Sequence, residues 1–234
     1  MLQAIPKGER LIAFGDLHLH WPAAQLILGY ARAEGINNAL NLGDEGAKLY
    51  PLESGDEIDY LRLYHELRLF RDESPKRVLV CVLGDKTGWV PKDLYTNYAD
   101  VTAEGKITGP SIYHHDNIIA VHHGKVLEEK HKKLVDDHKG YEPLVIFHGS
   151  SHSMSVLPKY KWLNDNEFVY WLERGVEKYQ LKPGKVYWVN PGGNFIMDDK
   201  GRMTANMAIY DPINQEIILQ TIPYDLNRIK SSLK

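Results

Sequence analysis

Five apolar segments of the sequence are each followed by aspartate or histidine, the residue types that hold metal ions. The clearest is Leu11–Phe14, which is followed by Gly15 and then by Asp16-Leu17-His18. In extended backbone, side chains two positions apart project from the same face, so we expect the Asp16 carboxylate beside the His18 imidazole. Mixed oxygen and nitrogen ligands suit manganese, iron or zinc better than calcium. Taken alone, the triplet fits a turn aspartate and a structural histidine better than a metal site.

The same arrangement recurs four more times along the chain. The segments end in Gly43-Asp44, in Gly84-Asp85, in His122-His123-Gly124, and in His148-Gly149 followed by His152. Short apolar runs bounded by glycine are typical of buried strands. In open α/β sheets, ligands bind outside the carboxyl ends of the strands. A simple turn explains any one of these segments, but the five together predict a metal site.

The composition is that of an ordinary globular protein and excludes several classes. The 234 residues, of which 43% are hydrophobic and 25% charged, predict one domain over 1–234. A net charge of -3 provides no electrostatic footprint for long nucleic acid or for an anionic membrane. The longest apolar runs fall far short of the ~20 residues that cross a bilayer. With no signal-peptide pattern and a single cysteine, Cys81, we expect a cytoplasmic protein.

The elements that carry these residues alternate between strands and helices. The pattern predicts helices over 21–34, 56–72 and 125–139, a further helix within 162–179, and a closing hairpin of 204–210 with 216–223. Alternating strands and helices followed by a hairpin predict an α/β fold with a mixed sheet or with two sheets.

The motifs resemble, in type and order, those of the calcineurin-like metallophosphoesterases. That superfamily has Asp-x-His, Gly-Asp, Gly-Asn-His, His-Gly and Gly-His-x-His motifs, each after a strand. The matching segments are Asp16-Leu17-His18, Gly43-Asp44, Gly84-Asp85, His123-Gly124 and Gly149-Ser150-Ser151-His152. Asn190-Pro191-Gly192 and Ile222-Pro223-Tyr224-Asp225 are similar to segments of the small bacterial and archaeal phosphodiesterases. The resemblance implies two packed, mainly mixed β-sheets flanked by helices, a metallophosphoesterase-like β-sandwich.

The resemblance also implies a function, namely metal-dependent hydrolysis of phosphate esters by a phosphodiesterase or phosphatase. It assigns Asp16, His18 and His152 to one metal, Asp44 to both metals, and Asp85 and His123 to the second. The implied cofactors are two divalent cations, with manganese the first choice among Mn, Fe, Zn and Ni, which activate a water for attack on phosphorus. The implied substrate is a small phosphate ester, and nucleotides are among the candidates.

Two positions depart from the superfamily pattern. Lys86 stands where the superfamily has the histidine that protonates the leaving group. A lysine can donate a proton if its pKa is lowered, although a solvated loop lysine is the simpler interpretation. Ser150 replaces a histidine ligand of the second metal, and His148 or His122 can substitute for it. His20 is a candidate phosphate contact, because it continues the spacing of Asp16 and His18.

Two other functions compete with hydrolysis. The altered motifs are also compatible with a non-catalytic binding scaffold of the same fold, in which the second metal site is degraded. A nuclease of the same superfamily is disfavoured for long duplex substrates, because the chain is mildly acidic and has no basic stripe.

Overall fold

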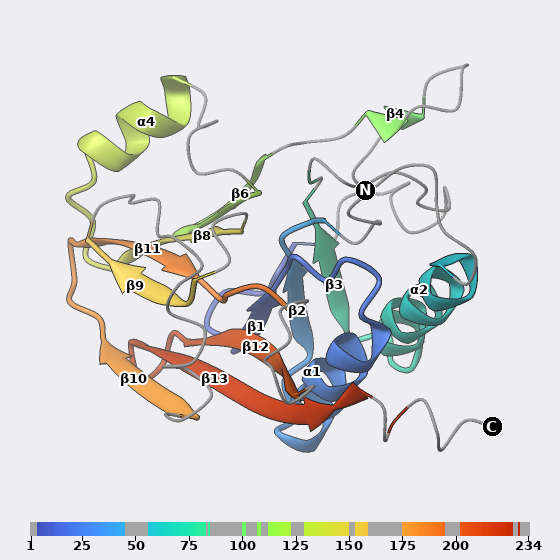
Figure 1. Ribbon diagram of the computed structural model, residues 1–234. Coiled ribbons are helices and arrows are strands. Elements are labelled where there is room, and N and C mark those ends of the chain that lie inside the picture. The colour runs from blue at the N-terminus through green and yellow to red at the C-terminus, as the bar shows by residue number, and fades with distance from the viewer. Residues whose placement is uncertain are drawn as a thin grey trace.

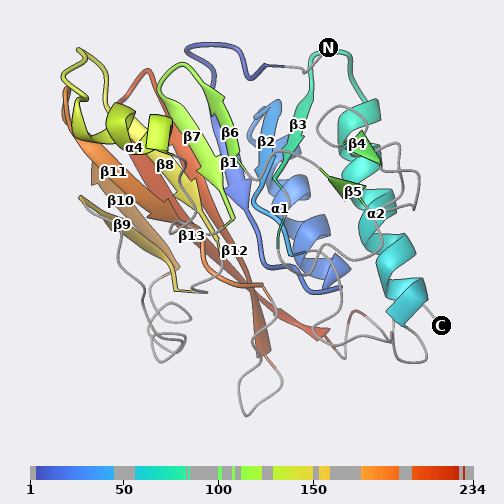
Figure 2. The ribbon, with the colours of Figure 1, turned by 90° about the horizontal axis from the view of Figure 1, so that it is seen from above.

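The chain folds into two β-sheets that pack face to face, with helices on their outer faces (Figure 1). The computed structural model describes residues 4–44, 56–82, 84, 100–101, 107–108, 112–122, 129–149, 153–158, 175–194, 202–226 and 229. Seen from above, the helix α4 (Glu129–Asp136), the two sheets, and the helices α1 (Trp21–Ala33) and α2 (Asp56–Asp72) follow one another as layers (Figure 2).

The larger sheet has six strands in the order β10-β13-β12-β1-β2-β3. Their bounds are β1 Leu11–Phe14, β2 Asn38–Asn41, β3 Val78–Cys81, β10 Val176–Gln180, β12 Arg202–Asp211 and β13 Glu216–Asp225. β1, β2 and β3 are parallel, whereas β10, β13 and β12 pair in antiparallel fashion. The carboxyl ends of the three parallel strands therefore meet at one edge of the sheet.

The smaller sheet has five strands in the order β6-β7-β8-β11-β9. Their bounds are β6 Ile112–His115, β7 Ile118–Val121, β8 Leu144–His148, β9 Ser155–Leu157 and β11 Val186–Asn190. β7, β8 and β11 are again parallel. A separate ribbon pairs β4 (Asp100–Val101) with β5 (Ile107–Thr108).

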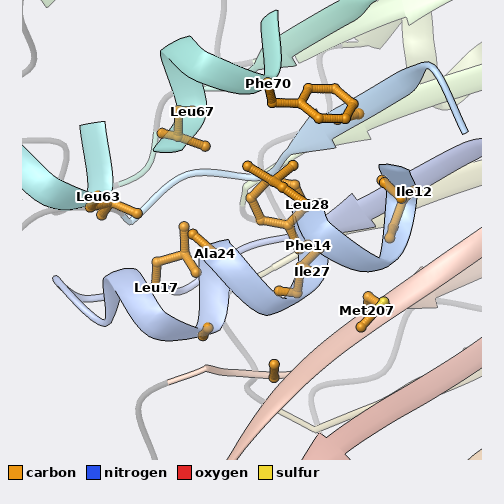
Figure 3. Close-up of a cluster of buried hydrophobic side chains, with 14 of the residues drawn as sticks. Ile12, Phe14, Leu17, Ala24, Ile27, Leu28, Leu63, Leu67, Phe70 and Met207 are labelled. Atoms are coloured by element: carbon orange, nitrogen blue, oxygen red, sulfur yellow. The ribbon is translucent and has the colours of Figure 1, made fainter. Parts of the chain in front are cut away.

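Buried side chains on both faces of the sheets hold these layers together. In β1, Leu11 and Ala13 face the core between the sheets, whereas Ile12 and Phe14 face the helices α1 and α2. A strand buried on both faces has an almost unbroken apolar sequence. Figure 3 shows the helix-facing core, to which α1 contributes Leu28 and α2 contributes Phe70. On the other side of the molecule, Leu134 and Val135 of α4 pack against the outer face of the smaller sheet.

The sequence-based expectations for the fold class are confirmed, and two details differ. The segment 176–179, the end of the range within which a helix is expected, is strand β10, and residues 162–174 of that range lie outside the described residues. Val176–Gln180 pairs with β13 over five residues, and Tyr179 packs against the core between the sheets. The helix expected over 125–139 ends at Asp136. Within the described residues, no helix is long and apolar enough to span a membrane.

Two leucines test the packing between helices and sheet. Leu28 of α1 is fully buried, whereas the side chain of Leu61 of α2 is 57% exposed. Leu28→Ala should lower the free energy of unfolding by ~3 kcal/mol, because it leaves a cavity in a packed core. Leu61→Ala should change it by less than about 0.5 kcal/mol. Urea unfolding measures both, and equal losses in the two variants would contradict this packing.

Candidate metal centre

The turns that follow β1 and β2 are hydrogen-bonded to each other through the backbone. The Asp16 N–H donates to the Gly43 carbonyl over 2.9 Å, and the His18 N–H donates to the Asp44 carbonyl over 2.9 Å. Because β1 and β2 are parallel neighbours, both turns leave the sheet at the same edge. The two segments that carry the predicted ligands are thus held against each other.

Three of the predicted ligands converge at this edge. One ligand atom each from Asp16, His18 and Asp44 lies within 4.8 Å of the others. Asp16 is fully buried and Asp44 is 6% exposed. Two carboxylates removed from water are unfavourable unless a cation or hydrogen bonds compensate their charge. Two carboxylates and one imidazole suit Mn, Fe or Zn, so this group fits a divalent transition-metal ion.

The backbone at the site adopts conformations that residues other than glycine seldom take. The φ angles are 50° for Asp16, 41° for His18, 68° for Leu19 and 57° for Asp44. Aspartate and histidine tolerate the left-handed region better than most residues, but leucine is an outlier there. Asp16 and His18 therefore meet through a left-handed turn, and the expectation that they share the face of an extended strand is wrong. Strained residues of this kind cluster at functional sites.

His122, directly after β7, is a fourth residue of the site. Its Nε2 lies 3.3 Å from Asp44 Oδ2, and its Nδ1 lies 2.8 Å from the Leu42 carbonyl oxygen. Burial lowers the pKa of His122, but the hydrogen bond and charge of Asp44, helped by Asp16, outweigh burial and raise the pKa to about 9. The site thus has a negative field that attracts a cation. From the sequence, His122 is expected only as a substitute ligand.

Two glycines give the carboxylates the room they occupy. A Cβ on Gly84 would lie 2.3 Å from Asp44 Oδ1 and 2.4 Å from the Asp44 backbone nitrogen. A Cβ on Gly149 would lie 3.2 Å from Asp16 Oδ2 and 3.3 Å from His122 Nδ1. The backbone after β3 therefore approaches the site as closely as glycine alone permits, and the backbone after β8 leaves little room for a side chain.

Asn194, which is not among the candidates expected from the sequence, fixes the turn of Asp16 from the other sheet. This fully buried residue follows β11. Its N–H donates to the Asp16 carbonyl over 3.1 Å, and its Nδ2 donates to the Gly15 carbonyl over 2.8 Å. Its Oδ1 accepts a 2.6 Å hydrogen bond from the Asn206 N–H. The signal for its role was its place in the Asn190-Pro191-Gly192-Gly193-Asn194 turn, although sequence alone does not tell which partner the turn meets.

Two further candidates are described but are not part of this cluster. His20 precedes α1, and its side chain makes no capping hydrogen bond. His148 is 1% exposed, and its ring lies edge-on to Trp188 with centroids 5.9 Å apart. Among the described residues, the three-ligand group contains neither of them. The remaining candidates, Asp85, Lys86, His123 and His152, lie outside the described residues.

Comparison with known proteins shows which fold this is. No protein-family model and no curated protein matches the sequence. A metallophosphoesterase from Sphaerobacter thermophilus has a similar structure, with a TM-score of 0.53, 15% identity, and coverage of 97% of this chain and 93% of that one. A novel archaeal phosphodiesterase gives a TM-score of 0.52 at 14% identity, with coverage of 92% and 99%. The chain therefore has the fold of this metallophosphoesterase and of this phosphodiesterase, as the resemblance implied.

The crowding at Gly84 leads to a stability prediction. Gly84→Ala should lower the free energy of unfolding by about 1–3 kcal/mol, because the added methyl displaces Asp44 or the backbone beside it. Gly29→Ala is the matched control, because a Cβ there meets nothing within 4 Å. Since Gly29 lies inside α1, that change should stabilise the protein by roughly 0.5–1 kcal/mol. Chemical denaturation distinguishes the two, and a Gly84→Ala variant as stable as the wild type would refute the close approach.

Proposed function

We propose that this protein is a metal-dependent hydrolase of small phosphate esters. The observation that carries the proposal is the convergence of Asp16, His18 and Asp44 at the ends of two parallel strands. The fold supports it, because the chain shares that fold with a metallophosphoesterase and with an archaeal phosphodiesterase. The reaction class is metal-assisted hydrolysis of the bond between phosphorus and the leaving oxygen.

In this proposal, each ligand has a definite part. Asp16 and His18 would hold the first cation, and Asp44 would serve both cations. From the stretches outside the described residues, His152 completes the first position and Asp85 and His123 serve the second. Divalent cations bound there, with manganese the first choice, supply Lewis acidity and a water of lowered pKa.

The protein's own residues fix the geometry of the site. The hydrogen bonds of Asn194 to the carbonyls of Gly15 and Asp16 fix the backbone that carries the Asp16 carboxylate. Burial of Asp16 and Asp44 strengthens their interaction with a cation, because little water screens it. Such preorganised ligands avoid the reorganisation that flexible carboxylates would need.

Charge favours phosphodiesters over phosphomonoesters as substrates. In this proposal Asp85, which stands where the resemblance implies a neutral asparagine, adds one negative charge at the second cation position. A diester has one negative charge, whereas a monoester at neutral pH has up to two, so repulsion by Asp85 disfavours the monoester more. Lys86 is the candidate donor of a proton to the leaving oxygen, and His20 the candidate contact to phosphate.

An activity assay tests the proposal. Protein stripped with a chelator should hydrolyse a bis-aryl phosphate diester only after Mn²⁺, Fe²⁺, Zn²⁺ or Ni²⁺ is added, and chelator should abolish the activity again. Asp44→Asn should lower kcat/KM by more than about 100-fold, because even changes in the residues behind metal ligands cost 10–100-fold.

Asp137→Asn is the control for this change, since it removes one carboxylate that is exposed just after α4. It should keep the wild-type kcat/KM within about twofold, as expected for a surface substitution. A wild-type protein that hydrolyses neither the diester nor an aryl monoester with any of these metals contradicts the proposal. That result would instead favour the non-catalytic scaffold.

A further inference from the structure

We propose that His122 is a ligand of the second cation and fills the role that Ser150 cannot fill. This inference rests on the proposed metal centre and adds a residue that lies outside the motifs of the resemblance. The sequence leaves two substitutes for the missing histidine ligand open, His122 and His148. His122 directly follows β7, and His148 is the last residue of the neighbouring parallel strand β8. Four geometric observations favour His122.

The first observation is the side of the sheet that each histidine faces. In β7, Ile118 and Ala120 belong to the core between the sheets, whereas Ile119 and Val121 belong to the core on the outer face. Alternation along the strand therefore directs His122 between the sheets, where Leu42 and Asp44 lie. Its hydrogen bond with the Leu42 carbonyl agrees with this direction.

The second observation is the hydrogen bond that sets which ring nitrogen carries a proton. His122 Nδ1 lies 2.8 Å from the Leu42 carbonyl oxygen, and a carbonyl oxygen can only accept. Nδ1 is therefore a donor, which leaves Nε2 as the ring nitrogen available to a cation. Metal-bound histidines almost always donate their other N–H to a carbonyl or carboxylate in this way. Leu42 lies two residues before Asp44, so one short segment positions both groups.

The third observation is what His122 Nε2 faces. It lies 3.3 Å from Asp44 Oδ2, with which the protonated ring forms an ion pair. A divalent cation can take the place of the Nε2 proton, because histidine binds metal in its neutral form. Ligand bonds to Zn²⁺ are ~2.0–2.2 Å long for nitrogen and carboxylate oxygen, so a 3.3 Å separation suits two neighbouring ligands of one ion.

The fourth observation is that Asp44 lies between two imidazoles. Its Oδ2 is 3.9 Å from His18 Nε2 and 3.3 Å from His122 Nε2. His18 joins Asp16 and Asp44 in the compact group of ligand atoms, and His122 does not. Asp44 therefore has Asp16 and His18 as partners in one cation position and His122 as partner in another. A shared carboxylate with distinct partners is what a two-cation centre requires.

His148 lacks these features. It continues the side of β8 that carries Leu144 and Ile146, which belong to the core on the outer face of the sheet. Its ring meets Trp188 of that same core, with an interplanar angle of 66°. His148 is therefore directed away from Asp44 and toward α4.

Metal-binding stoichiometry tests the assignment without relying on activity. Chelator-treated wild type, His122→Gln and His148→Gln are titrated with Mn²⁺ by equilibrium dialysis and calorimetry. His65→Gln, at an exposed position of α2, is the control for loss of a surface imidazole. Wild type, His148→Gln and His65→Gln should each bind about two equivalents. In His122→Gln the first equivalent should keep its affinity, and the affinity for the second should fall at least about 100-fold.

The outcomes separate this inference from the proposed function. If His122→Gln binds both equivalents like the wild type, or if the wild type binds fewer than two, the assignment of His122 is wrong. If His122→Gln loses the second equivalent but the wild type hydrolyses no phosphate ester, the assignment stands and the proposed function fails. If the wild type hydrolyses phosphate esters and His122→Gln keeps the affinity for the second equivalent, the proposed function stands and the assignment of His122 fails.

A measurement on the wild type protects the test against a variant that does not fold. ¹⁵N-labelled protein loaded with ¹¹³Cd²⁺ should show a cadmium–nitrogen coupling to Nε2 of one particular imidazole. That ring is identified by its slowly exchanging Nδ1 proton and its nuclear Overhauser contact with Leu42. Absence of the coupling at this ring in fully loaded protein overturns the proposal.

Discussion

Two carboxylates held out of water beside each other are the constraint on which the rest of this structure depends. Asp16 and Asp44 follow neighbouring parallel strands, and the turns that carry them are bonded through their backbones. Burying two like charges without a cation is unfavourable. The fold must therefore overcome their repulsion with packing and hydrogen bonds from both sheets, and it thereby creates a position that attracts divalent metal.

The scaffold supplies this rigidity from three directions. The helices α1 and α2 pack against one face of the six-stranded sheet through a continuous apolar core (Figure 3). Asn194 reaches across from the five-stranded sheet and holds the backbone of Gly15 and Asp16. His122 enters from the end of β7 and is tied to Leu42. Because four non-glycine residues at the site have left-handed backbone, the surrounding contacts must determine their conformation, as is usual at strained functional sites.

The sequence was informative where a pattern is local and less so where contacts are distant. Strand ends with Gly-Asp and His-Gly identified the edge at which Asp16, His18 and Asp44 meet. The expectation that Asp16 and His18 share one face of an extended strand is wrong, since a left-handed turn brings them together. The sequence does not predict β10 as a strand, because its pairing with β13 joins residues about forty positions apart in the sequence and leaves no local signal.

The choice between His122 and His148 shows a different limit. Both follow apolar strands that are buried on two faces, so hydrophobicity does not mark which face meets the other sheet. Only the packed sheets distinguish the residues that face the interior from those that face α4. The same holds for Asn194, whose partner Gly15 is 179 positions away along the chain.

The central claim is that buried carboxylates and imidazoles at these strand ends form a metal centre. Elemental analysis of protein purified without chelators measures it most directly, beside an Asp16→Asn, Asp44→Asn double variant prepared in parallel. The account predicts about two equivalents of a transition metal per wild-type chain and almost none in a folded double variant. Wild-type protein that contains no metal and takes up none from added Mn²⁺ would contradict it.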